Sequence, residues 1–416
     1  MTASTLGGLI RGSGLGLSLV LQLFLAWQLS APDYGTVAVG LSLSTICSIL
    51  ATLGLDTAGS RDVARSGSEP GFAAQWWRQA QGHLLRRVGI PLVAYVLVAL
   101  VLTRLADAVD FWALAIFGLT VPGLALLRLL EGVARGSRLT VHASAWTTMV
   151  LPLTWGSLLA LTSIALPDLS PGLVGGLRLL AVAGIALVAQ LLVSRSLGAA
   201  SPRSASDDEP LIRTPTGLLA LAVLSTGSAQ IDTLIASATL GPEHAGSYAL
   251  AARLTGGVAV ILFGVNLVAA PALAAAHSDG TIFEAANQVR QLLRRAVPAA
   301  AMLAGITGAA IATIFPRLGA DYTSPPAMLA FLLVAQVLSV AYGPVGTALT
   351  MTFDEWSAVR ALCAALGIQC VLSVVAAGLW GPSGVALGTL AGVASWNGMM
   401  QRRVQARLGV RLRYGG

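Results

Sequence analysis

The sequence predicts an all-α integral membrane protein with twelve transmembrane helices in two six-helix bundles. Three observations lead to this fold class. Of the 416 residues, 56% are hydrophobic and only 10% are charged, and the mean hydropathy is +0.79, which is unlike a soluble domain. The apolar residues form runs long enough to cross a hydrocarbon core about 30 Å thick. The sequence also repeats a pattern at an offset close to half its length.

The repeated pattern joins two turns that each begin a hydrophobic run. Residues 29–40 read LSAPDYGTVAVG, and residues 240–251, at an offset of 211, read LGPEHAGSYALA. A second match, between residues 54–66 and 266–278, has an offset of 212. Because the two offsets agree, we expect an internal duplication of six spans.

The duplication predicts the domain organisation. We expect an N-terminal six-helix bundle over residues 1–200 and a C-terminal bundle over residues 216–416. Residues 201–215 are rich in Ser, Pro and acidic residues without an apolar period, which is typical of a cytoplasmic linker.

The spans follow from the apolar runs. We expect them near residues 6–29, 34–55, 88–103, 111–127, 141–164, 173–194, 216–240, 245–267, 296–315, 328–351, 361–379 and 383–401. Pro122 should kink the fourth span, because proline removes a helix hydrogen bond. Residues 69–87 mix tryptophan and arginine with apolar residues and predict an amphipathic helix in the membrane interface. A solvated loop is the alternative for the first half of that segment.

Arginine placement predicts the orientation. All 25 basic residues are arginines, of which twenty lie in the C-terminal tail or in loops after even-numbered spans. Two lie in loops after odd-numbered spans. Because positive loops stay in the cytoplasm, we expect both termini to be cytoplasmic, in a bacterial inner or plasma membrane. The net charge of +7 therefore indicates membrane topology and no nucleic-acid partner.

The sequence lacks the motifs of several functional classes. The sequence has no phosphate-binding P-loop and no lysine to complete one, which argues against ATP-driven transport by this chain alone. Its three cysteines lie inside predicted spans without a CxxC pair or a histidine cluster, so we expect no metal site and no cofactor. A long outer loop, which a membrane glycosyl polymerase or ligase would use, is missing from the predicted topology. A transporter is favoured over an enzyme.

Charges inside the spans are the candidate functional residues, because a charge at the membrane centre costs about 3 kcal/mol. Arg253 lies about nine residues into the eighth span, or roughly 13 Å deep. Asp232 lies at a comparable depth in the seventh span. Asp232 and Arg253 are interpreted either as an ion pair that holds the helical hairpin together, or as a coupling acid beside an anion-binding base.

Two further arginines are candidates for the same cavity. Arg11 and Arg61 lie toward the cytoplasmic ends of the first two spans, where a guanidinium could bind phosphate oxygens. For Arg61 the alternative is a positive-inside anchor, and for Arg11 a side chain that reaches the interface. Asp56 and Glu131 are expected at water-exposed span ends.

The residues around the two turns resemble a known family. SAPDYGTVAVGLSLSTICSILATLGLDTAGSRDVARS and AQIDTLIASATLGPEHAGSYALAARL are similar to the second-span and the seventh- and eighth-span regions of Wzx-type polysaccharide or O-antigen flippases. These belong to the multidrug/oligosaccharidyl-lipid/polysaccharide exporter (MOP) superfamily, which includes the MATE-like transporters.

The resemblance implies a central cavity between two bundles, alternating access and a cationic binding site. It implies an undecaprenyl-pyrophosphate-linked oligosaccharide as substrate, moved to the outer leaflet for surface polysaccharide or lipopolysaccharide synthesis. Arg11, Arg61 and Arg253 match the cationic cavity, whereas the repeat partner of Arg61 is Leu273, so the cavity need not be symmetric. Membrane lipids and a polysaccharide polymerase are expected partners. A proton gradient, a sodium gradient and the membrane potential are left open as the energy source.

Three alternatives are kept. A drug or metabolite cation antiporter of the same superfamily would use an acid-lined cavity, for which Asp232 is the candidate. A flippase for peptidoglycan precursors usually has two further spans. A glycosyl polymerase or ligase lacks its outer loop here.

Overall fold

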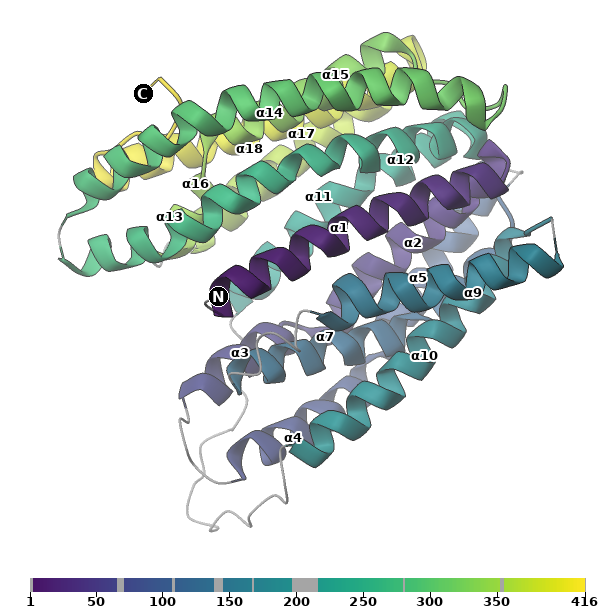
Figure 1. Ribbon diagram of the computed structural model, residues 1–416, viewed down its shortest axis with the longest axis horizontal. Helices are drawn as coiled ribbons and strands as arrows, with labels where there is room; N and C mark the ends of the chain where they lie inside the picture. Colours follow the sequence, from purple (N-terminus) through teal and green to yellow (C-terminus); the bar gives the residue numbers. More distant parts are fainter. Residues whose placement is uncertain are drawn as a thin grey trace. The chain divides into compact units, whose positions relative to one another are not determined.

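The chain is described by a computed structural model that covers residues 3–65, 71–106, 109–137, 145–166, 168–196, 216–279, 281–351 and 355–415. These residues form helices and contain no strand (Figure 1), which confirms the all-α fold class. The expected linker at 201–215 lies outside the described residues. The first half holds α1 (Ala3–Gln28), α2 (Ala31–Thr52), α3 (Leu55–Arg65), α4 (Phe72–Arg87), α5 (Gly89–Leu105), α6 (Phe111–Gly118), α7 (Val121–Gly136), η1 (Trp146–Val150), α9 (Leu151–Ala165) and α10 (Pro171–Ser196).

The second half is also entirely helical where the structure describes it. It holds α11 (Thr216–Leu240), α12 (Pro242–Gly256), η2 (Gly257–Ala259), α13 (Val260–Asp279), α14 (Ile282–Leu318), α15 (Pro326–Tyr342), α16 (Val345–Met351), α17 (Glu355–Trp380) and α18 (Pro382–Leu408).

Nine helical stretches among the described residues are long and apolar enough to cross a membrane. Two shorter apolar helices, Gly12–Gln28 and Pro326–Tyr342, lie where the first and tenth spans are expected, and α18 lies at the place of the twelfth. The protein is therefore a multi-pass membrane protein, and the count of twelve spans stays a prediction.

The chain forms two compact units. Unit 1 comprises Met1–Leu29 and Thr36–Thr226, and unit 2 comprises Ser30–Gly35 and Gly227–Gly416. The chain passes from one unit to the other between α1 and α2, again inside α2, and a third time inside α11. The expected boundary at the linker stays a prediction.

Small residues let the helices of unit 1 pack closely. A Cβ atom on Gly132 of α7 would lie 2.1 Å from the Asp56 carbonyl oxygen of α3, so only glycine fits there. The indoles of Trp76 and Trp77 on α4 are buried, and that of Trp76 packs against Gly59. The segment predicted to lie in the membrane interface is thus a helix, but its tryptophans pack into unit 1.

Pro122 lies next to a break in its predicted span. α6 ends at Gly118 and α7 begins at Val121, with Pro122 in its first turn. A proline at this place lacks only an N–H that has no partner in a helix start. The break at Leu119 and Thr120 therefore lies where the kink is predicted, and the bend of the span itself stays a prediction.

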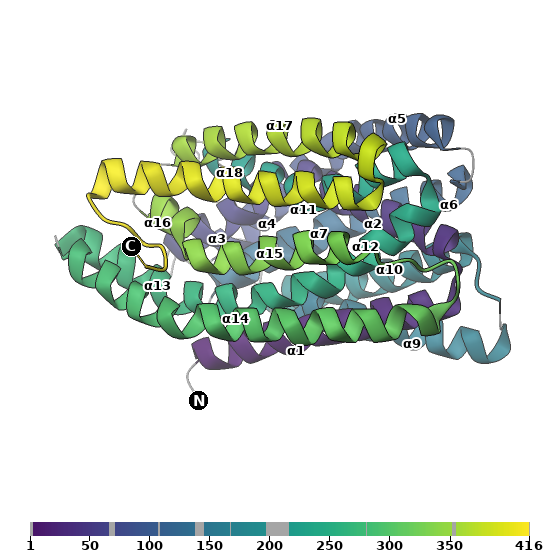
Figure 2. The ribbon, with the colours of Figure 1, turned by 90° about the horizontal axis from the view of Figure 1, so that it is seen from above.

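In unit 2, α17 and α18 pack against each other along their length. Figure 2 shows the two helices side by side. A Cβ atom on Gly384 would lie 1.9 Å from the Ala376 carbonyl oxygen, and one on Gly388 would lie 2.1 Å from the Ser373 hydroxyl oxygen. Glycines thus set the distance between these two helices.

The two repeated turns meet each other within unit 2. A Cβ atom on Gly35 would lie 2.0 Å from the Pro242 carbonyl oxygen, and one on Gly246 would lie 2.1 Å from the Ala31 carbonyl oxygen. The glycines that the duplication places at equivalent positions therefore form one reciprocal contact. Beside it, Tyr322 makes edge-on ring contacts with Tyr34 at 6.3 Å and with Phe315 at 6.2 Å between centroids.

Candidate functional site

Asp232 is a buried acid whose carboxylate is bound by neutral groups. Its side chain is 5% exposed. Asp232 lies in the part of α11 that belongs to unit 2, which runs from Gly227 to Leu240. The Tyr248 hydroxyl donates a hydrogen bond of 3.1 Å to Oδ2, and the Thr233 backbone N–H donates one of 2.8 Å to Oδ1. The Thr389 hydroxyl lies 3.5 Å from Oδ2 and 3.0 Å from the Tyr248 oxygen. Three donors from α11, α12 and α18 thus hold the acid.

A second polar group lies one helical turn before Asp232. The Ser228 hydroxyl donates to the side-chain oxygen Oε1 of Gln369 over 2.9 Å, and the Gln369 side-chain Nε2 donates to the Ser228 backbone carbonyl oxygen over 3.1 Å. Because Ser228 and Asp232 are four residues apart, they share one face of α11. This face carries a polar seam, made of Ser228, Asp232, Gln369 and Thr389, between α11, α17 and α18.

Arg253 has a different partner. It is half-buried in α12 and is a hydrogen-bond partner of the Tyr34 hydroxyl. Tyr34 is fully buried and belongs to the short segment Ser30–Gly35 that clusters with unit 2. The structure therefore gives Asp232 and Arg253 separate partners, and a role of Arg253 in binding an anion stays a prediction.

Arg61 lies in unit 1 and has an acid beside it. Its Nε atom is 2.8 Å from Oδ1 of Asp62, and the two side chains are 33% and 14% exposed. Arg11 lies in α1, and its side chain is outside the described residues. That Arg11 and Arg61 line a cavity with Arg253 stays a prediction.

Sequence reasoning missed a polar group in unit 1. Arg128 of α7 donates from Nε to the Ser48 hydroxyl of α2 over 3.1 Å. Glu131, one turn later, accepts hydrogen bonds from the Thr147 backbone N–H at 3.1 Å and from the Thr147 hydroxyl. Glu131 was expected in water and Arg128 in a loop. Both expectations are wrong, because α7 continues to Gly136 and makes both side chains half-buried.

The partner of Glu131 lies in an unusual turn. η1 is a π-helical turn that leads into α9, and such turns occur often at functional sites. A Cβ atom on Gly14 of α1 would lie 2.4 Å from the Thr148 carbonyl oxygen. The turn is thus fixed by close packing on one side and by a carboxylate on the other.

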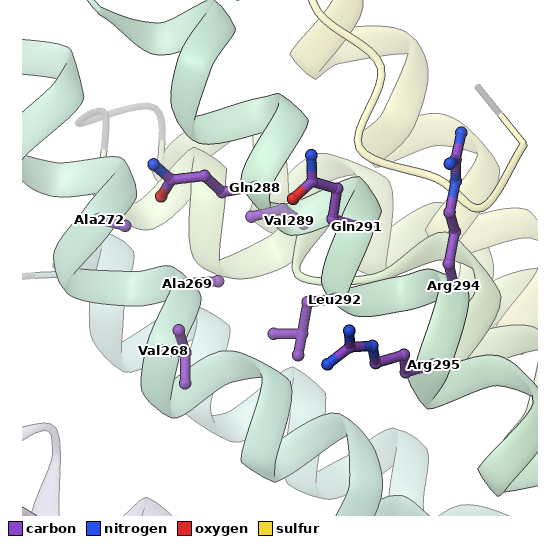
Figure 3. A pocket seen from close by; sticks show the side chains of 9 residues that line it. All are labelled: Val268, Ala269, Ala272, Gln288, Val289, Gln291, Leu292, Arg294 and Arg295. Carbon is purple, nitrogen blue, oxygen red and sulfur yellow. The ribbon is translucent and has the colours of Figure 1, made fainter.

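Unit 2 also carries a groove of about 560 Å³ between α13 and α14. Figure 3 shows Val268 and Ala269 of α13 facing Leu292 of α14, and Arg295 turned back toward Leu292 while Arg294 points away. The lining therefore combines apolar side chains with two glutamines and two arginines, and of the two arginines Arg295 turns toward Leu292. Among the described residues, no cluster of three His, Cys, Asp or Glu side chains could hold a metal ion.

Solved structures share this fold over nearly the whole chain. An inward-facing multidrug resistance MATE family transporter of the MOP superfamily has a TM-score of 0.66 at 14% identity, covering 98% of this chain and 95% of that chain. The lipid II flippase MurJ, in an inward closed conformation, has a TM-score of 0.69 at 12% identity, covering 96% and 87%. A MOP superfamily transporter from Pyrococcus furiosus has a TM-score of 0.58 at 15% identity, covering 98% of each chain. At these identities the likeness shows the fold.

The sequence itself gives the family. A search of curated proteins finds no match. Residues 5–277 match the family described as polysaccharide biosynthesis protein. The matched stretch includes both repeated turns, Asp232 and Arg253, and it exceeds half of the 416 residues. The chain therefore belongs to the polysaccharide biosynthesis protein family, as its resemblance to the flippases indicated.

Proposed function

We propose that the protein is a flippase that moves an undecaprenyl-pyrophosphate-linked oligosaccharide from the cytoplasmic to the outer leaflet by alternating access. The observation that carries the proposal is Arg253. It is a half-buried cation inside the apolar stretch Pro242–Leu273, in a chain of the polysaccharide biosynthesis family. A charge in this place is costly unless function requires it.

The chemistry of the substrate explains why a cation is useful there. Sugars and a pyrophosphate lose their hydrogen bonds to water in hydrocarbon, and each unsatisfied group costs several kcal/mol. A guanidinium binds phosphate oxygens with two parallel hydrogen bonds and stays charged at any relevant pH. Tyr34 would orient the guanidinium of Arg253, because the two side chains are hydrogen-bonded.

The lipid tail needs an apolar surface while the headgroup crosses. The groove between α13 and α14 (Figure 3) offers Val268, Ala269 and Leu292 as such a surface, with Arg295 beside it. The isoprenoid chain is its proposed occupant, because the groove's one inward-turned guanidinium complements a phosphate joined to an apolar chain.

Asp232 is the proposed coupling residue. Its partners Thr233, Tyr248 and Thr389 are neutral, so a proton or a sodium ion could bind the carboxylate without breaking an ion pair. Binding would change the charge of the polar seam in unit 2. A change of charge at a buried site is a general way to bias a two-state transporter.

A drug or metabolite antiporter is the second candidate, and Asp232 is the observation that favours it. Solved neighbours include multidrug MATE transporters as well as the lipid II flippase MurJ. A buried acid suits a cationic substrate, whereas Arg253 suits an anionic one. The experiment below separates the two.

The test is export of surface polysaccharide in a deletion strain that is complemented with the wild type, Arg253→Gln or Arg317→Gln. Arg317 is an exposed arginine at the end of α14 and serves as the matched control. We expect Arg253→Gln to let lipid-linked glycan accumulate inside, with export reduced about tenfold, which corresponds to about 1.4 kcal/mol. Arg317→Gln should restore export.

Protein levels in the membrane are measured for each variant, and Arg253→Lys, which keeps the charge but lacks the planar fork, should restore export in part. Unchanged export with Arg253→Gln at normal protein level would refute the cationic site. Normal surface glycan in the deletion strain, together with raised drug sensitivity, would support the antiporter.

A further inference from the structure

We propose that unit 2 carries a second anion-binding site, where the C-terminal tail closes over the end of α18, and that its ligand is a phosphate group. The site is a pocket of about 560 Å³ between α15, α17, α18 and the tail. Its polar lining comprises three arginines, one tyrosine, two glutamines and one serine: Arg402, Arg411, Arg413, Tyr342, Gln401, Gln405 and Ser395. No carboxylate is among the described residues that line it.

The sequence explains how the tail reaches the pocket. Gly409 adopts φ = 71° and its N–H donates to the Gln405 carbonyl oxygen, which ends α18 with a left-handed cap. The chain then turns back beside α18 (Figure 2), and the Tyr414 N–H donates to the Ala341 carbonyl oxygen at 2.7 Å. The tail is thereby fixed at both ends.

The residues between these two bonds alternate. Val410 and Leu412 are buried, with exposures of 5% and 0%, whereas Arg411 and Arg413 are exposed and line the pocket. In an extended chain successive side chains point to opposite sides. The Val-Arg-Leu-Arg pattern therefore buries two apolar anchors and presents two guanidinium groups on the same side.

Helix α18 supplies the facing wall. Ala394, Gly398, Gln401 and Gln405 line the pocket at spacings of three or four residues, which is one face of a helix. Along this wall, the end near Ala394 and Gly398 lacks charged side chains, and the end nearer the tail carries Arg402. An amphiphile with a phosphate headgroup fits this order along the helix, and a free phosphate fits the end nearer the tail.

Gln401 gives the independent sign of a missing ligand. It is 5% exposed, and its side-chain oxygen Oε1 accepts a hydrogen bond of 3.2 Å from the Leu412 backbone N–H. That bond fixes which end of the amide is the donor. The amide nitrogen Nε2 is buried and has no hydrogen-bond partner. Buried donors are almost always paired, so a bound acceptor beside this N–H would complete the site.

A phosphate group meets these requirements better than a carboxylate. It offers enough oxygens for the Gln401 amide and for more than one guanidinium, and arginine binds such oxygens in pairs. Three arginines without a carboxylate repel one another, and an anion of charge −1 or −2 relieves that repulsion. The positive-inside rule alone would explain the arginines but not the unpaired buried amide.

The decisive variant is Gln401→Glu in the full-length protein purified in detergent. The glutamate has nearly the shape of glutamine and keeps an acceptor for the Leu412 N–H, but it replaces the donor with a negative oxygen. Binding is measured with two probes, inorganic pyrophosphate and short-chain phosphatidic acid. We expect the wild type to bind at least one probe and Gln401→Glu to weaken that binding at least tenfold.

Two further variants keep the test sound if Gln401→Glu fails to fold. Arg402→Gln and Arg413→Gln remove exposed cations and should each weaken binding several-fold, whereas the exposed Arg317→Gln should not change it. Binding of phosphatidic acid alone identifies a lipid headgroup as the ligand, and binding of pyrophosphate identifies a free anion. Absence of binding to the wild type, or equal binding to all variants, overturns the proposal.

Discussion

The two repeated turns share a backbone plan and differ in chemistry. Both α2 and α12 begin near a proline and carry an acid in the first turn, Asp33 or Glu243. Each then has the glycine that contacts the other turn, Gly35 or Gly246. The glycine that allows close helix packing is therefore present in both copies.

The Asp232 carboxylate, the Tyr248 phenol and the Arg253 guanidinium are present in one copy only. At the offset of 211 residues, Ser42 stands at the place of Arg253 and Leu21 at the place of Asp232. Val37 likewise replaces Tyr248, and both Val37 and Ser42 are fully buried. The first copy thus has a glycine turn of the same kind without an acid, a phenol or a guanidinium at these three positions. This difference is why we look for a function of Asp232, Tyr248 and Arg253.

The largest effect is expected where the copies are alike. Gly246→Val would place a branched side chain against the Ala31 carbonyl oxygen, which a Cβ atom alone would approach to 2.1 Å. Such overpacking against backbone costs about 3 kcal/mol or more. We expect little folded protein in a size-exclusion profile. Gly256→Ala, a position with nothing within 4 Å, should fold normally, and normal folding of Gly246→Val would show that the contact is dispensable.

A smaller effect is expected where the copies differ. Asp232→Asn keeps the shape of the side chain but cannot change its charge, so transport should fall about tenfold, or about 1.4 kcal/mol, with unfolding unchanged. Glycan export and thermal unfolding are measured together. Tyr248→Phe removes the 3.1 Å hydrogen bond to the acid and should instead lower stability by about 1–2 kcal/mol. If Asp232→Asn transports normally, Asp232 is only a hydrogen-bond acceptor.

The smallest effect is expected for Arg61. Its ion pair joins neighbouring residues and its side chain is 33% exposed, so solvent screens the pair and Arg61→Gln should cost less than about 1 kcal/mol. The unfolding midpoint of the purified protein checks this value. A loss of export as large as that of Arg253→Gln, at unchanged stability, would place Arg61 in the transport path.

The local features of the fold were predictable from the sequence. The helix Thr216–Leu240 has the predicted bounds, and a break lies next to Pro122, where the kink is predicted. The reason is that apolar run length, proline and glycine act over a few residues. The bounds of helices of intermediate hydropathy are harder to predict from composition. One example is α18, whose C-terminal part is polar.

The partners of the charged residues were not predictable. Tyr34 and Arg253 are more than two hundred positions apart, and the bond between Thr389 and Asp232 joins α18 to α11. Such contacts depend on how helices pack, which one sequence does not encode in any local period. A buried tyrosine usually finds a hydrogen-bond partner, and this is the one signal by which Tyr34 and Tyr248 could have been found in the sequence.

The π-helical turn η1 sets the register of the helix that follows it. A π-turn accommodates one residue more than an α-helical turn, and each residue rotates a helix by about 100°. Removing one residue from Trp146–Val150 would restore an ordinary helix but turn α9 by that angle. The Trp155 indole would then lose its 3.3 Å hydrogen bond to the Val174 carbonyl oxygen. The length of this turn, more than its residue types, thus determines which face α9 presents to α10.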